Sequence, residues 1–154
     1  MADPIPFPKS PLPPLSMIEE AQVSITRLKQ VLDGAFIDCE IEPEGDLYIS
    51  HGLDFPIWIS QDRERKLLNP YTCIGVRELA LGGAHAELNE LNKKLIMAKF
   101  HLHDGALWGN TWITYDGGLL PRQFVTVLRR FANVFLQATN EPCVAHFFKQ
   151  ENEG

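Results

Sequence analysis

The sequence predicts an α+β fold, an antiparallel sheet flanked by helices in the order α-β-β-β-(β)-α-β-β-α. Three observations support this prediction. Three segments place apolar residues at spacings of three and four, as on one face of a helix. The segments between them are rich in β-branched and aromatic residues and alternate every second residue, as strands do. An Asp-Gly pair at 104–105 suits a two-residue hairpin turn, which makes the strands around it antiparallel.

The chain of 154 residues is long enough for one domain with its own core. We expect a proline-rich leader at residues 1–15, a single α+β domain at 16–148 and a polar tail at 149–154. The leader contains six prolines, which favour extended polyproline II. It either lies against the domain or is the ligand of a proline-recognition groove in another protein.

Charge and cysteine content narrow the class of protein. A net charge of −6 opposes binding to nucleic acid or to an anionic membrane surface. The three cysteines, Cys39, Cys73 and Cys143, have no Cys-x-x-Cys spacing, which argues against a disulfide framework and a zinc site. There is also no signal-peptide pattern and no apolar run of membrane-spanning length. We therefore expect a cytoplasmic protein with no membrane and no nucleic-acid partner.

The first helix is predicted to begin at a capping box, Ser16-Met17-Ile18-Glu19, and to end near Asp33, with Gly34 as a left-handed cap. Short strands are expected at 36–42, 47–50 and 55–60, and residues 61–66 form a solvated loop. A further strand at 67–76 is weakened by Asn69-Pro70. A group of carboxylates near the first strands is interpreted as a solvated edge: Asp38, Glu40, Glu42, Glu44 and Asp46.

A second helix is predicted at 84–96, where Asn89 and Asn92 either tie the helix to the sheet or contact a substrate. A hairpin of strands 98–103 and 106–115 follows. Its turn pairs His103 with Ala106, and the pairing continues along both strands. After Gly117-Gly118, Pro121 opens a last helix that ends near Thr139. Its predicted buried residues are Phe124, Val127, Leu128, Phe131, Val134 and Phe135.

The hairpin separates two faces. Phe100, Leu102, Leu107, Thr111 and Ile113 face the core. The opposite face carries the predicted binding site: Lys99, His101, Trp108, Asn110 and Trp112. Aromatic rings beside polar groups are typical of protein interfaces, so this face is interpreted as a dimer contact or a surface for a protein partner. The alternative is that the leader or a helix covers it.

Other chemistry has less support. His101 and His103 share a strand face and could give two metal ligands, with His51 or His146 as a third, in a ligand- or metal-responsive sensor. Ser60, Cys73 and Cys143 lack a nucleophile elbow, and no phosphate-binding glycine loop is present. Arg122, Arg129 and Arg130 either meet an acidic partner or are solvated. We therefore expect no enzyme and no cofactor.

The segment Leu88-Asn-Glu-Leu-Asn-Lys-Lys-Leu-Ile-Met-Ala-Lys-Phe-His-Leu-His-Asp-Gly resembles the YbjN family of bacterial proteins. The resemblance extends over residues 84–139 and includes Gly117-Gly118 and the terminal helix. It implies a fold similar to that of type III secretion chaperones, which are small acidic proteins that dimerise and hold partly unfolded clients. It also implies a role in sensory transduction or stress regulation. The sequence thus favours a non-enzymatic binding module, chaperone-like or regulatory, that acts as a homodimer.

Overall fold

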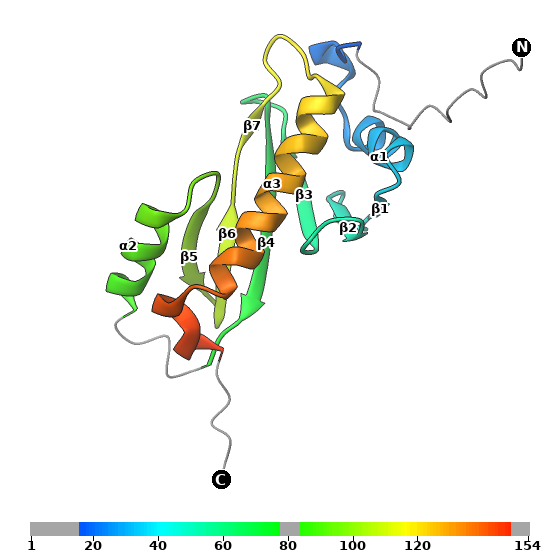
Figure 1. Cartoon of the computed structure of the whole chain (residues 1–154). Helices are drawn as coiled ribbons and strands as arrows, with labels where there is room; N and C mark the ends of the chain where they lie inside the picture. Colours follow the sequence, from blue (N-terminus) through cyan, green and yellow to red (C-terminus); the bar gives the residue numbers. More distant parts are fainter. Residues whose placement is uncertain (1–15, 78–83, 149–154) are drawn as a thin grey trace, which may run out of the picture.

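The predicted α+β fold is confirmed by the computed structural model, which describes residues 16–77 and 84–148. Seven antiparallel strands form one sheet, and the helices flank it (Figure 1). The predicted leader, the polar tail and the Gly82-Gly83 pair lie outside the described residues.

The strands follow the sheet order β1-β2-β3-β4-β6-β5, with β7 also paired to β4. Their bounds are β1 Asp38–Ile41, β2 Leu47–His51, β3 Ile57–Asp62, β4 Leu67–Gly75, β5 Lys99–His103, β6 Ala106–Asn110 and β7 Ile113–Thr114. The helices are η1 Glu20–Gln22, α1 Ile25–Gly34, α2 His85–Lys94, α3 Pro121–Thr139 and η3 Pro142–Phe147. The predicted 61–66 loop is shorter than expected because β3 continues to Asp62.

Helix α3 crosses one face of the sheet, the inner face, and supplies much of the core (Figure 1). It begins at Pro121 and ends at Thr139, as predicted. Its buried rings are Phe124, Phe131 and Phe135, whereas Val127 and Val134, predicted to be buried, are only half-buried. One apolar cluster lies around α1 and the first half of α3, and a second lies around α2, η3 and the end of α3.

The predicted start of the first helix is wrong. Helix α1 begins at Ile25, and its cap is Ser24, whose hydroxyl accepts a hydrogen bond from the Arg27 amide at 3.1 Å. Ile18 is instead buried in an antiparallel bridge with Leu119. The predicted cap at Gly34 is also wrong, because the residue with positive φ after the helix is Phe36, at 57°.

The hairpin of β5 and β6 has the predicted register, with His103 opposite Ala106 and His101 opposite Trp108. Asp104 and Gly105 both have positive φ, at 48° and 72°, as a two-residue type I′ turn requires. The turn type therefore fixes which side chains share a face.

The predicted strand 106–115 is divided into β6 and β7, and Pro70 explains the division. Asn110 pairs with Tyr71 and Ile113 pairs with Leu68, so one register runs through both strands. Within it, Thr111 lies opposite Pro70 and donates its amide to the Pro70 carbonyl at 3.0 Å. Proline has no amide proton to return, so the ladder is interrupted there.

Candidate functional site

The outer face of the sheet, opposite α3, carries a row of aromatic rings that crosses five strands. Stacked contacts join Tyr48 to Trp58 at 4.7 Å, Trp58 to Tyr71 at 6.1 Å and Tyr71 to Trp108 at 6.2 Å between ring centroids. His101 stacks on Trp108 at 6.3 Å. We call these five residues the aromatic row. Each ring projects outward because its neighbours in the strand, such as Leu47, Ile49, Ile57 and Ile59, are buried on the inner face.

All five residues of the predicted binding site line one shallow hollow at the end of this row. The hollow has a volume of about 360 Å³, and its lining includes Lys99, His101, Trp108, Asn110 and Trp112 together with Asn69 and Tyr71 of β4. Trp108 is fixed in place because its indole N–H donates to the His103 carbonyl at 3.0 Å. Trp112 is 52% exposed. The rim thus combines two indoles, an ammonium, an imidazole and side-chain amides.

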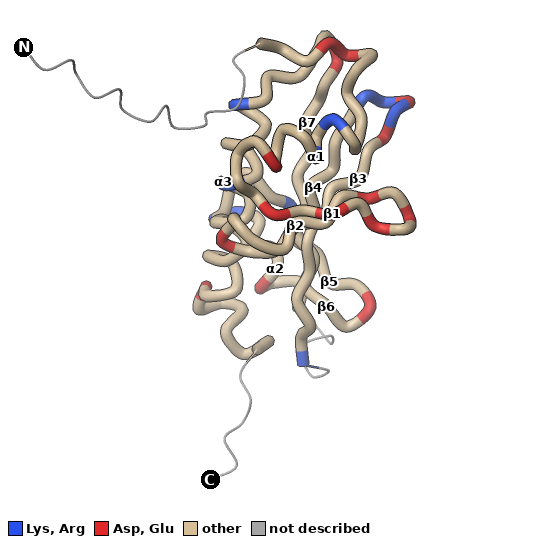
Figure 2. The backbone as a smooth tube through the Cα atoms, turned by 90° about the vertical axis from the view of Figure 1, so that its right-hand side faces the viewer, with Lys and Arg blue, Asp and Glu red and all other residues tan. Residues whose placement is uncertain are grey.

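The other end of the aromatic row meets the acidic turn between β1 and β2. Trp58 Nε1 donates to Glu42 Oε1 at 3.2 Å, and the Tyr71 hydroxyl donates to Asp46 Oδ2 at 2.6 Å. Burial, followed by the bond to Asp46, raises the pKa of Tyr71 far above its usual value. The interpretation of these two carboxylates as merely solvated is therefore wrong. Figure 2 shows the acidic residues gathered along this turn and the adjoining strands.

The other two histidines considered as metal ligands, His51 and His146, lie in elements other than the β5–β6 hairpin that carries His101 and His103. His51 ends β2, which is separated from β5 by β3, β4 and β6 in the sheet, and His146 lies in η3 near Glu87. Within residues 16–77 and 84–148 no group of three or more histidine, cysteine or acidic side chains is placed to hold a metal ion. Burial, with Lys99 and His103 nearby, lowers the pKa of His101. That ring is therefore held towards its neutral form, stacked on Trp108.

Two of the cysteine thiols, those of Cys39 and Cys73, have raised pKa values. Burial raises the pKa of Cys73, and burial together with Asp33 raises the pKa of Cys39 to about 11. Both thiols are therefore protonated at neutral pH, which disfavours nucleophilic chemistry. In the part of the chain that the structure describes, no helix combines the length and the apolar character needed to cross a membrane.

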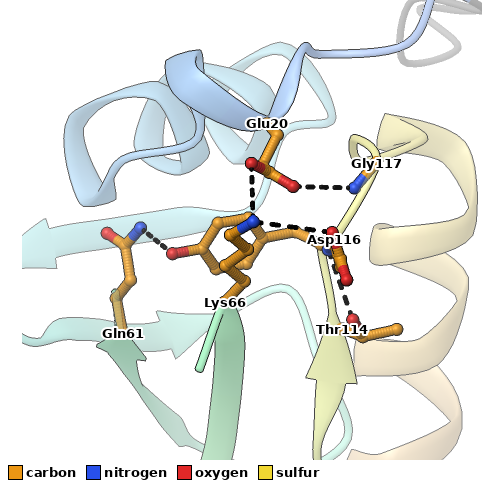
Figure 3. A network of polar contacts seen from close by, with 7 residues as sticks. Glu20, Gln61, Lys66, Thr114, Asp116 and Gly117 are labelled. Atoms are coloured by element: carbon orange, nitrogen blue, oxygen red, sulfur yellow. Dashed lines mark hydrogen bonds and ion pairs between the residues drawn. The ribbon is translucent and has the colours of Figure 1, made fainter. Parts of the chain in front are cut away.

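A polar network at the far end of the sheet was missed by the sequence reasoning. Glu20 accepts the Gly117 amide at 2.9 Å and pairs with Lys66 at 3.0 Å, and Lys66 also lies 3.6 Å from Asp116 (Figure 3). The Gly117 amide and the Lys66 ammonium lower the pKa of Glu20 to about 2. No local pattern indicates a contact between residues 97 positions apart. The network fastens η1 to the loops before β4 and α3.

Asn92 of α2 joins the helix to the sheet by two hydrogen bonds, which is one of the two roles that the sequence predicted for it. Its Nδ2 donates to the Phe100 carbonyl at 3.0 Å, and its Oδ1 accepts the Phe100 amide at 2.8 Å. In the β5–β6 ladder His101 and His103 form hydrogen-bonded pairs with β6, and Phe100 lies at a non-hydrogen-bonded position. The amide and carbonyl of Phe100 therefore point away from β6, toward the outer edge of β5. Asn92 thereby occupies part of an edge that another strand would otherwise pair with. Asn89 is exposed.

Comparison with known proteins places the fold. No model of a known protein family matches the sequence, and no curated protein matches it. A solved structure that does match is YbjN from E. coli, described as a putative transcription regulator. The TM-score is 0.64 with 17% sequence identity, over 77% of this chain and 92% of that chain. The resemblance to YbjN is therefore supported as a distant relationship in fold.

Proposed function

We propose that this chain is a non-enzymatic protein-binding module of the cytoplasm, a chaperone-like or regulatory adaptor, whose outer sheet face holds a segment of another protein. The observation that carries the proposal is the aromatic row together with the hollow at its end. Indole and phenol rings give large contact areas at a low cost in side-chain entropy, and interfaces are enriched in them.

Charge specifies the kind of segment that fits. The carboxylates of Glu42 and Asp46 lie against Trp58 and Tyr71, and Glu40 pairs across from Tyr48 on the same face. A cationic side chain over these rings would gain both cation–π and charge attraction. At the opposite end, Lys99 and His101 favour an acidic or polar group. The proposed partner is therefore a protein segment with basic residues toward the β1–β2 turn.

We also propose that the chain acts as a homodimer. Trp112 is exposed and Trp108 is half-buried on the same face, and a second copy or the partner would shield both rings. Light scattering at several concentrations distinguishes a dimer from the 17.4 kDa monomer. A mass that stays at one chain at every concentration contradicts the homodimer and leaves partner binding to be tested separately.

The binding test uses a chemically unfolded polypeptide, reduced and carboxymethylated lysozyme, as a model client. Trp108→Ala and Trp112→Ala, each still folded by circular dichroism, are expected to weaken its binding by about tenfold or more, which corresponds to about 1.4 kcal/mol or more per buried indole. Binding is measured by fluorescence anisotropy of the labelled client.

The matched control is Leu136→Ala, which removes an exposed apolar side chain from α3 on the opposite side of the molecule. It should leave the affinity unchanged. The proposal fails if the two tryptophan variants bind the client as tightly as the Leu136 variant does.

A further inference from the structure

A second hollow lies at the edge of the sheet, between β7 and α3, and belongs to neither the aromatic row nor the hollow at its end. It has a volume of about 430 Å³. Its strand side includes Trp112, Ile113 and Thr114, its helix side includes Phe124 and Val127, and Met97 lines it as well. We call it the edge groove. Trp112 lines both hollows.

The backbone on the strand side of the edge groove is arranged for pairing with another strand. The amides of Thr111 and Tyr115 donate toward β4, to Pro70 and Lys66, both at 3.0 Å. Successive residues of an antiparallel strand direct their backbone groups to opposite sides, so Trp112 and Thr114 direct theirs away from β4. No described strand pairs with β7 on that side (Figure 1).

Strand β5 stops short of this position. In its register with β6, Lys99 lies opposite Asn110, so residue 97 would be the next to face Trp112. Met97 has a φ of 71°, which turns the chain out of the extended conformation. Strand β5 therefore does not continue alongside Trp112 and Thr114, and the edge groove lies there, lined on its other side by α3.

The chain itself enters beside the edge groove. Ile18 and Leu119 exchange two backbone hydrogen bonds of 2.8 Å, and Leu119 lines the edge groove. Met17 packs so closely on Gly118, another lining residue, that a Cβ added there would lie 2.6 Å from the Met17 sulfur. Met17 and Ile18 thus lie at the rim of the groove.

The sequence before Ser16 matches a strand that can pair on one side only. In Pro4-Ile5-Pro6-Phe7-Pro8, every second residue is proline and lacks an amide proton. Ile5 and Phe7 keep their amide protons. Because they are two positions apart in the chain, an extended segment would direct the amide and carbonyl groups of both residues to the same edge. Proline is accepted in a strand where its nitrogen faces away from the partner. The alternation also blocks a further strand from adding outside it.

We propose that the segment 4–8 adds to the open edge of β7, so that Ile5 and Phe7 pair with the backbone of Trp112 and Thr114 and the prolines cover the edge groove. The connection to the described chain has seven residues, 9–15, and would reach up to about 22 Å if extended at the 3.1 Å per residue of polyproline II. The segment then completes the sheet at this edge and shields one side of Trp112.

The experiment measures amide hydrogen exchange of Trp112 and Thr114 by NMR in the full chain. The test variant is Ile5→Asp/Phe7→Asp, and the control, Ser10→Asp/Leu12→Asp, adds the same two charges outside the proposed strand. We expect the test variant to exchange at these two amides at least about tenfold faster than the parent, and the control to match the parent.

Equal exchange in parent and test variant overturns the proposal, as does an equal acceleration in the control. Exchange is also compared at several protein concentrations. Protection that is independent of concentration supports pairing within one chain. Protection that disappears on dilution would show that the strand comes from a second copy and would refute the intramolecular arrangement.

Discussion

Replacing Asn92 by alanine removes the two hydrogen bonds that join α2 to the outer edge of β5. Neutral hydrogen bonds contribute about 0.5–1.5 kcal/mol each. Asn92 is itself exposed, so water can replace part of the loss, and about 1–2 kcal/mol for the pair is the appropriate range. Alanine is also the better helix former by about 0.5 kcal/mol, which offsets some of the effect.

Asn89→Ala is the control variant. Asn89 is exposed on the same helix, so this substitution changes the helix propensity by the same amount without removing the two bonds. The difference in the free energy of unfolding between the two variants isolates the two bonds. Urea unfolding followed by circular dichroism should place the Asn92 variant about 1–2 kcal/mol below the Asn89 variant. Equal stability of the two variants would refute the edge-bonding role of Asn92.

Two further predictions concern packing and pH. A Cβ at Gly109 would lie 2.6 Å from Phe135 Cδ2, so Gly109→Ala should lower the free energy of unfolding in urea titrations by about 1–3 kcal/mol. The control is Gly75→Ala, whose added Cβ meets nothing within 4 Å and should leave the free energy of unfolding unchanged. Similar values for the two variants would contradict this packing. The pKa of Glu20 falls from 4.5 unfolded to about 2 folded, so the stability it contributes is present above pH 4.5 and is lost as the pH falls toward 2. Glu20→Gln should therefore flatten the dependence of stability on pH across that window, and parallel curves for parent and variant would rule out this contribution.

Local chemistry predicted those parts of the fold where the decisive interaction is local. The Asp104-Gly105 turn sets the hairpin register by itself, and Pro121 opens α3 where its fixed φ suits a first helical turn. The five predicted site residues meet around one hollow for the same reason, since the turn determines which of them share a face.

The errors arose where distant contacts overrode a local pattern. Ser16 and Glu19 have the spacing of a capping box, yet Ile18 pairs with Leu119, about a hundred residues away in the chain, and α1 starts later. The aromatic row was missed because Tyr48, Trp58 and Tyr71 align only through the registers of β2, β3 and β4, which no single hairpin turn specifies.

The placement of the tryptophans has a spectroscopic consequence. The protein has three, Trp58, Trp108 and Trp112, and each projects from the outer face of the sheet, while the large buried rings are phenylalanines. Intrinsic emission excited at the indole band therefore reports on the surface and carries little signal from the core. Occupancy of the outer face should therefore be readable from intrinsic emission without any label.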